Sequence, residues 1–154
     1  MIRKCKIGKN IKIPFPKLVN FYECKIGDDS FIGPFVEIQK GASIGKRCRI
    51  QSHSFICEGV TIGDDCFIGH GVIFVNDLFP ICNDPNWKLK KTLVKDKVSI
   101  GNNATLLPVI IGESSLIGAG AVVVRNIPAY TIVAGNPAKI LRKYNVRSRK
   151  RKKV

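Results

Sequence analysis

Isoleucine recurs at every sixth residue through the first half of this 154-residue chain. The series is unbroken over eight positions, and phenylalanine takes the next: Ile26, Ile32, Ile38, Ile44, Ile50, Ile56, Ile62, Ile68 and Phe74. A period of six fits neither the turn of an α-helix nor the heptad of a coiled coil, so a helix would scatter these side chains around its surface. Short strands joined by tight turns would instead bring all of them inside.

A small or β-branched residue stands four places after each isoleucine, and glycine directly follows several of them. The first set is Ser30, Val36, Ala42, Cys48, Ser54, Val60, Cys66 and Val72, and the glycines are Gly27, Gly33, Gly45, Gly63 and Gly69. This pattern is typical of an all-β solenoid with three six-residue rungs to each triangular coil. Residues 18 positions apart, such as Ile26 and Ile44, would then stack about 4.8 Å from one another.

The length and composition favour a single domain. With 45% hydrophobic residues the chain can close one solenoid core, and no apolar run approaches the roughly 20 residues that a membrane span needs. The basic start, residues 1–6, has no apolar segment behind it and does not resemble a signal peptide. We therefore expect a cytoplasmic protein with no membrane span and with its β-helix over residues 1–138.

The six cysteines favour buried thiols over a metal site or disulfides. Cys48 and Cys66 fall in the same inward column, and the others show no C-x-x-C spacing: Cys5, Cys24, Cys57 and Cys82. Free thiols are typical of a reducing cytoplasm, and the ligand clusters of structural zinc are missing from the sequence. We expect no metal.

The net charge of +15 is concentrated near the C-terminus. No acid follows Glu113, and nine cations lie between residues 139 and 153: Lys139, Arg142, Lys143, Arg147, Arg149, Lys150, Arg151, Lys152 and Lys153. A block such as 147–153 predicts a solvated, disordered tail, with phosphate or anionic membrane contact as the alternative. The solenoid offers no helix for a groove, so we expect no nucleic-acid partner.

The six-residue register fails between Asn76 and Lys97 and resumes at Ile100. This predicts an extruded loop over residues 77–97, and loops this long in compact domains are usually functional. Further on, Pro137 can begin a short helix that reaches Tyr144. Residues 139–154 are therefore predicted to form a short helix followed by the basic tail.

Two groups of motifs carry a family resemblance. Residues 117–123 (IGAGAVV) followed by 133–139 (VAGNPAK) make the chain from about Ile26 to Arg142 resemble the bacterial hexapeptide-repeat acyltransferases. Residues 55–60 (FICEGV) followed by 75–77 (VND) resemble the nucleotide-sugar 3-N-acetyltransferases of that superfamily. The resemblance implies a left-handed β-helix, a homotrimer, and acetyl-CoA as co-substrate. The acceptor it implies is an amino sugar linked to UDP or dTDP, in surface-polysaccharide or lipopolysaccharide biosynthesis.

Stacking brings the two short motifs into one place. Glu58 and Asn76 are 18 residues apart and should lie one above the other at one corner, with Asp77 beside them. By the resemblance, Glu58 holds the amine and helps to deprotonate it, Asn76 orients the reacting groups, and Asp77 binds the sugar or its amine. The alternative is that Glu58 is a solvated corner residue and that 76–77 merely begin a turn.

The histidine supply bears on the acceptor. Only His53 and His70 are present, and neither falls in the loop where the O-acetyltransferases of this fold carry their base. A hydroxyl needs a strong base such as imidazole, whereas an amine keeps a neutral fraction and tolerates a carboxylate. We expect both histidines to be hydrogen-bonded corner residues, with His53 the alternative base. Two histidines also argue against the three-histidine zinc site of the γ-class carbonic anhydrases.

The resemblance also assigns the coenzyme A site. It places Asn102 and Ala119 near the pantetheine and Val124 on a wall, with Lys139 and Arg142 on the nucleotide phosphates. On a helix, cations three residues apart would face the same way, although a basic tail that simply continues is the alternative. The sequence thus predicts an acetyl-CoA-dependent sugar N-acetyltransferase, with O-acetylation of a sugar or serine, or a non-catalytic scaffold subunit, as alternatives.

Overall fold

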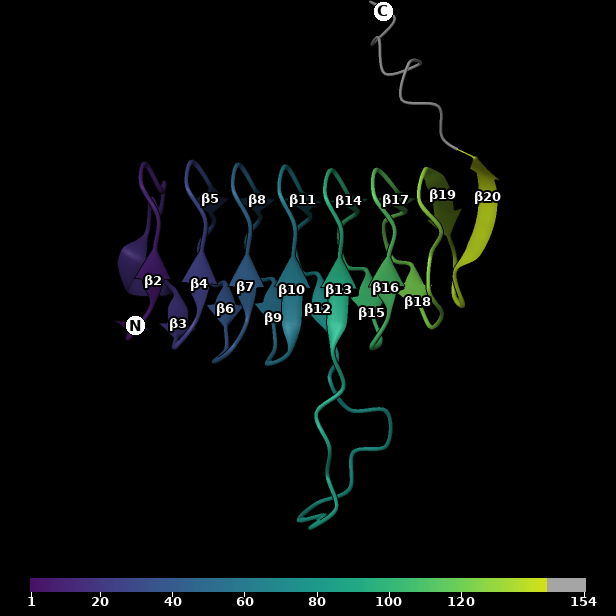
Figure 1. Cartoon of the computed structure of the whole chain (residues 1–154), viewed down its shortest axis with the longest axis horizontal. Coiled ribbons are helices and arrows are strands. Elements are labelled where there is room, and N and C mark those ends of the chain that lie inside the picture. Colours follow the sequence, from purple (N-terminus) through teal and green to yellow (C-terminus); the bar gives the residue numbers. More distant parts are fainter. Residues whose placement is uncertain (144–154) are drawn as a thin grey trace, which may run out of the picture.

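Three parallel β-sheets form the faces of a triangular solenoid, as the six-residue period predicts (Figure 1). The structure is a computed structural model and describes residues 1–143. These residues make about seven turns with almost no helix, consistent with a left-handed β-helix, and the predicted all-β solenoid is confirmed. Pro16–Leu18 forms one short 3-10 helix near the N-terminus.

Almost every strand is two or three residues long, and each sheet collects every third strand of the chain. Sheet A contains β1 (Ile2–Arg3), β3 (Asn20–Tyr22), β6 (Glu37–Ile38), β9 (Phe55–Ile56), β12 (Ile73–Phe74), β15 (Thr105–Leu106) and β18 (Val122–Val123). Sheet B contains β2 (Lys6–Ile7), β4 (Lys25–Ile26), β7 (Ser43–Ile44), β10 (Val60–Ile62), β13 (Thr92–Val94) and β16 (Ile110–Ile111). Sheet C contains β5 (Phe31–Ile32), β8 (Arg49–Ile50), β11 (Phe67–Ile68), β14 (Ser99–Ile100), β17 (Leu116–Ile117), β19 (Thr131–Ala134) and β20 (Lys139–Lys143).

The isoleucine columns form the core. Ile26 pairs with Ile44, and Ile44 with Ile62, along sheet B, and all three are at most 2% exposed. Burying an isoleucine side chain stabilises a fold by about 1.5–3 kcal/mol. The repeated columns therefore hold each coil to the next along the whole axis.

The turns between sheets line up as three long edges. Edge AB joins sheets A and B and includes residues 57–59; edge BC includes 45–47 and 63–65; edge CA includes 51–53, 69–71 and 101–103. Because each coil repeats the same path, residues at equivalent turns stack along one edge. Side chains on different edges are separated by the width of a sheet.

The long loop leaves the solenoid at edge AB and extends away from it (Figure 1). It spans residues 75–91, so the predicted loop of 77–97 was too long at its C-terminal end. β13 has already rejoined the solenoid there, with Val60 opposite Thr92 and Ile62 opposite Val94. Val94 fills an isoleucine place but is followed by a lysine, so this rung lacks the usual isoleucine–glycine signature.

The predicted helix from Pro137 is wrong. Lys139–Lys143 forms β20, which runs antiparallel to β19 and closes the end of sheet C. The last strand of a sheet presents unpaired backbone groups, and pairing with β20 satisfies them. Tyr144 and the predicted tail at 147–153 lie outside the described residues.

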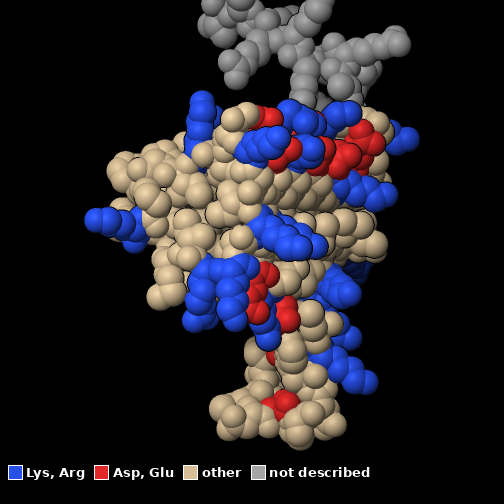
Figure 2. All heavy atoms as spheres, turned by 60° about the vertical axis from the view of Figure 1, so that its left-hand side comes forward, with Lys and Arg blue, Asp and Glu red and all other residues tan. Residues whose placement is uncertain are grey.

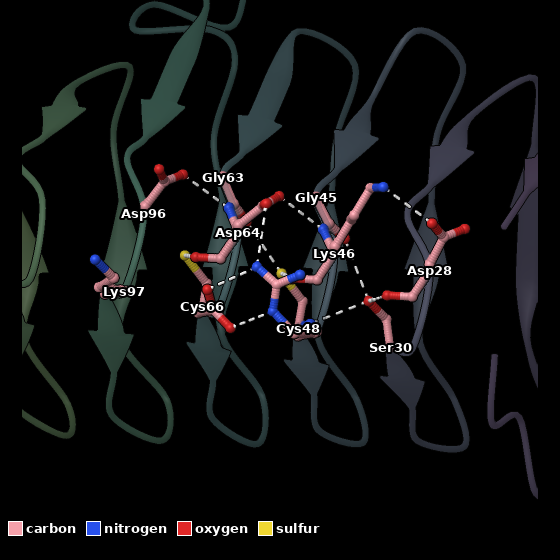
Figure 3. A network of polar contacts seen from close by, with 12 residues as sticks. Asp28, Ser30, Gly45, Lys46, Cys48, Gly63, Asp64, Cys66, Asp96 and Lys97 are labelled. Carbon is pink, nitrogen blue, oxygen red and sulfur yellow. Dashed lines mark hydrogen bonds and ion pairs between the residues drawn. The ribbon is translucent and has the colours of Figure 1, made fainter. Parts of the chain in front are cut away.

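Charged side chains form a ladder along edge BC. Asp64 accepts a hydrogen bond from the Lys46 backbone N–H at 2.8 Å, and Lys46 Nζ lies 3.0 Å from Asp28 (Figure 3). Arg47 pairs with Asp65 at 2.7 Å, and this hydrogen bond lowers the pKa of the Asp65 carboxyl. Acidic and basic groups consequently alternate over this edge (Figure 2). The pairs therefore link successive coils along this edge.

Most of the thiols are buried, as predicted. Cys48 Sγ donates to the Gly63 carbonyl at 3.0 Å, and Cys66 Sγ to the Lys95 carbonyl at 3.2 Å. Burial raises the pKa of the Cys57 thiol to about 11, which keeps it neutral at neutral pH. Cys5 is only half-buried, and Cys82 lies exposed on the loop.

Candidate functional site

Glu58 and Asn76 lie one above the other on edge AB, as the 18-residue spacing predicts. Glu58 occupies the turn between β9 and β10, and Asn76 follows β12 where the loop leaves the solenoid. The Asn76 side-chain Nδ2 donates to the Glu58 backbone carbonyl at 3.2 Å. The Asn76 amide and the Glu58 backbone are therefore held together at the base of the loop.

The preceding coil fixes the position of Glu58. Its backbone N–H donates to Gln39 Oε1 at 3.2 Å, and its carboxylate lies 3.6 Å from Lys40 Nζ. The Glu58 side chain is 29% exposed, so a ligand in solution can reach it. Sequence reasoning missed Gln39 and Lys40, although the same 18-residue rule places Lys40 directly below Glu58.

Asp77 forms a turn within the loop, whereas Asn76 bonds to the solenoid. Its Oδ1 accepts the Phe79 backbone N–H at 2.9 Å, which makes a turn of the kind that aspartate favours. Asp77 also lines a hollow of about 310 Å³ within the loop, beside Trp87 and Lys90. The turn predicted as the alternative is thus present for Asp77.

The loop is anchored beside Glu58 at its other end. The Lys90 backbone N–H donates to the Asn76 carbonyl at 3.1 Å, which closes the base of the loop. Leu89 packs over Gly59, where a Cβ would lie only 3.1 Å from the leucine side chain. The loop base, rather than its exposed end, therefore sets the geometry around Glu58.

Two predicted coenzyme A residues lie on edge CA instead. Asn102 Oδ1 accepts the His70 backbone N–H at 3.0 Å, and the Asn102 carbonyl accepts the Gly120 N–H at 2.8 Å. Ala119 is exposed one coil further along the same edge, and Val124 is 42% exposed just after β18. Asn102 and Ala119 thus lie toward the C-terminal end of the solenoid, on the far side of sheet A from Glu58, whereas Val124 follows a strand of sheet A and lies on edge AB.

Lys139 and Arg142 share one face of β20, but not for the reason that a helix would give. Residues three apart on a regular strand point to opposite faces. A register shift between Ile132 and Val133 changes this, because Lys139 then lies opposite Ala134 and Arg142 opposite Ile132. Paired residues on antiparallel strands share a face, and Val133, between the two, is the buried one. Both cations therefore lie on the outward side of sheet C.

The two histidines lie on edge CA and not with Glu58. His70 Nδ1 is 2.7 Å from the Ser52 hydroxyl, as expected of a hydrogen-bonded corner residue. The His53 ring packs on Phe35, with 4.8 Å between ring centroids and an interplanar angle of 33°. Neither imidazole belongs to the edge that carries the carboxylate and the loop.

Two searches of the described part of the chain gave negative results. Over residues 1–143 no three histidine, cysteine, aspartate or glutamate side chains are grouped so that they could hold a metal ion. In the same residues, no helix has the length and apolar character needed to cross a membrane.

Sequence comparison identifies the repeat. Residues 23–57 match the family described as bacterial transferase hexapeptide, and residues 59–75 and 108–127 match the hexapeptide repeat of succinyl-transferase. The bifunctional protein GlmU of Thermotoga petrophila is 31% identical over 150 residues, which include 90% of this chain. GlmU of Lawsonia intracellularis is 36% identical over 126 residues. The chain spans only 33% and 24% of these two relatives.

Solved structures with this fold include acyltransferases. AntD, an N-acyltransferase from Bacillus cereus in complex with dTDP and coenzyme A, superposes with a TM-score of 0.81 at 22% identity. That match covers 92% of this chain and 85% of AntD. A hexapeptide-repeat acetyltransferase from Vibrio cholerae, complexed with acetyl-CoA, gives a TM-score of 0.69 at 29% identity, over 84% of this chain and 73% of that one.

Proposed function

This chain belongs to the hexapeptide-repeat transferases, as its sequence predicts, and we propose that it transfers the acetyl group of acetyl-CoA to the amine of a nucleotide-linked amino sugar. The observation that carries the proposal is the pair on edge AB, where Asn76 donates to the Glu58 carbonyl at the base of the loop. The nucleotide is UDP or dTDP, and the product would serve surface-polysaccharide synthesis. Asp77, near the start of the loop, would bind the sugar or its amine.

The chemistry fits the groups at this edge. Lys40 pairs with the Glu58 carboxylate in the free protein, and the ammonium group of an amino sugar can take the place of the lysine. Glu58 then accepts one proton, and the amine lone pair attacks the thioester carbonyl of acetyl-CoA. The carbon–sulfur bond breaks, and the coenzyme A thiolate takes the second amine proton and leaves as the free thiol. An amine needs no stronger base than a carboxylate near neutral pH. Asn76, fixed by its hydrogen bond, would orient the reacting groups.

The structural neighbours support an acyl-CoA reaction. AntD is an N-acyltransferase and has been solved with dTDP and coenzyme A, and the Vibrio cholerae acetyltransferase has been solved with acetyl-CoA. We extend the cofactor to this chain through Asn102, Ala119, Val124, Lys139 and Arg142. These residues suit an anionic, extended ligand because two are cations and Ala119 leaves room at the turn.

A direct assay tests the proposal. The protein is incubated with acetyl-CoA and a panel of UDP- and dTDP-linked amino sugars, with the matching hydroxy sugars as controls, and products are identified by mass spectrometry. Acetylation of an amino sugar only is the expected result. Transfer to the hydroxy sugars or to serine would replace the proposal by O-acetylation, and no transfer to any acceptor would favour a scaffold subunit.

The complete site would be shared between copies of the chain. Glu58 and Asn76 lie on edge AB, whereas Asn102 and Ala119 lie on edge CA, so one copy does not bring them together. If edge AB of one copy faces edge CA of the next, three copies close a ring with three equivalent sites. We therefore propose a homotrimer of about 51 kDa, three times the 17.0 kDa chain.

Mixing two inactive variants tests the shared site. Glu58→Ala damages edge AB, and Ala119→Trp fills edge CA, so each homotrimer should keep about a tenth of wild-type activity or less. Trimers formed at random from equal amounts of both should recover about a quarter of wild-type activity, because about one interface in four joins two intact edges. A mixture as inactive as its parents, although native mass spectrometry shows mixed trimers, would rule out the shared site.

The assignment of Lys139 and Arg142 can be tested against a third cation on the same strand. Lys139→Ala or Arg142→Ala should raise KM for acetyl-CoA several-fold, and the effect should shrink at high salt because ions screen phosphate contacts. Lys143 is the matched control because it lies opposite the buried Thr131, on the other face of β20. An equal rise in KM for Lys143→Ala would show that general basic charge, not this face, attracts the cofactor.

A further inference from the structure

One column of edge CA changes character along the solenoid. Its members are the residues with positive φ at successive turns: Phe35 (58°), His53 (62°), Gly71 (64°), Asn103 (56°) and Gly120 (67°). Backbone hydrogen bonds connect these turns; for example, the His53 N–H donates to the Pro34 carbonyl and the Gly71 N–H to the Ser52 carbonyl. The first two members carry rings, whereas the last three are glycine or asparagine.

The two rings are costly at this place. A positive φ favours glycine and asparagine and disfavours a bulky side chain. Burial does not compensate for this, because Phe35 is 53% exposed and His53 is also exposed. The rings instead contact each other at 4.8 Å. They form an aromatic pair on the surface, which we call the ring platform.

A groove adjoins the ring platform. It has a volume of about 330 Å³ and is lined by Leu18, Val19, Asn20, Phe35, Val36 and Glu37. Its walls are mainly apolar, and Asn20 supplies an exposed amide that can both donate and accept hydrogen bonds. A flat ring with a polar rim fits such a surface, because the faces stack while the edge is read by the amide.

We propose that the ring platform and its groove hold the nucleobase of the sugar nucleotide. This assignment rests on the proposed function. Asn102 and Ala119, the coenzyme A candidates, lie on the same edge but toward the C-terminal end, where the column narrows to Gly71, Asn103 and Gly120. Small residues there leave room for an extended pantetheine. Phe35 and His53 lie on coils nearer the N-terminus than the coil of Asn76.

The order of these features along the axis fits a two-substrate reaction. The turn of Phe35 precedes β6, one coil before Glu58, and Asn102 follows β14, one coil after Asn76. At about 4.8 Å per coil, Phe35 and Asn102 are separated along the axis by three coils, or about 14 Å. A sugar nucleotide entering from the N-terminal end and coenzyme A from the C-terminal end would then meet at the level of Glu58 and Asn76.

Phe35→Asn provides the test because asparagine suits a positive φ and occupies the same column at Asn103. Binding of UDP, dTDP and acetyl-CoA is measured by isothermal titration calorimetry. We expect the variant to bind the preferred nucleotide about tenfold more weakly, the usual scale of one lost base stack. Its affinity for acetyl-CoA should not change, and its melting temperature should be no lower than that of the wild type.

Tyr130→Asn is the matched control. Tyr130 is an aromatic residue with a φ of 55° and 43% exposure, but it lies on edge BC, where its N–H donates to the Glu113 carbonyl. This change should leave nucleotide affinity unaltered. Unchanged nucleotide binding by Phe35→Asn would overturn the inference while leaving the proposed function intact. Loss of the trimer in Phe35→Asn would overturn it too, since the ring platform would then be a contact between copies. If the wild type binds neither nucleotide at millimolar concentration, the inference and the proposed function fail together.

Discussion

Glu58→Ala should lower kcat/KM for the amino-sugar nucleotide by about 10-fold to 10³-fold, which corresponds to roughly 1.4–4 kcal/mol of transition-state stabilisation. The Glu58 carboxylate lies beside the base of the loop on edge AB. Its removal leaves the substrate ammonium without a proton acceptor at this edge. Asn76→Ala should give a loss of similar size because Asn76 is stacked on Glu58. Steady-state kinetics with acetyl-CoA saturating, and light scattering to verify the oligomer, provide the measurement.

Three further variants separate the chemistry from the packing. Glu58→Gln keeps the shape of the side chain and should lose most of the activity if the charge matters. Lys40→Ala removes the 3.6 Å ion pair on a largely exposed lysine and should change kcat little. His70→Ala should also change kcat little, since the His70 ring nitrogen is engaged with the Ser52 hydroxyl. If His53→Ala or His70→Ala abolished kcat while Glu58→Ala stayed near wild type, an imidazole base would have to replace the carboxylate.

The fold was predictable because one rule, the six-residue period, operates over most of the chain. The two errors occur where that rule weakens. At β13 the inward places are taken by Thr92 and Val94 with no glycine after them, so the sequence signal is lost although the pairing with β10 is regular. At β20 the local proline signal favoured a helix, but the open end of sheet C offers backbone partners that only the assembled sheet reveals.

The candidate site was predictable only in part. The 18-residue spacing correctly placed Asn76 over Glu58, and it would equally have found Lys40. It also assigned His53 and Phe35 to one column, but the contact between their rings and their exposure depend on backbone angles that spacing does not give. The turn made by Asp77 depends likewise on the path of the loop. Finally, the spacing within one chain cannot predict that residues on two different edges meet in one site, because such a meeting depends on how copies of the chain pack together.

Gly112→Ala should lower the free energy of unfolding by about 3 kcal/mol or more. A Cβ at this position would collide with the Ala129 nitrogen and would lie 2.6 Å from both the Ala129 Cα and the Pro128 carbonyl carbon. All three are backbone atoms of the next coil, so no flexible side chain can move aside. The coils would have to separate, which would disturb the hydrogen bond from the Gly112 N–H to the Ile127 carbonyl. Urea unfolding followed by circular dichroism measures the loss.

Gly41→Ala distinguishes coil spacing from backbone strain as the reason for these glycines. Gly41 has a φ of +72°, but a Cβ there would meet nothing within 4 Å. Its replacement should therefore cost only the strain of a left-handed residue, about 1–2 kcal/mol. Gly112 has no positive φ, so its whole loss would come from the approach of the next coil. Equal losses for the two variants would contradict this explanation. A much larger loss at Gly112 would mean that the glycine after the repeated isoleucine is required because stacked coils leave no room for a Cβ.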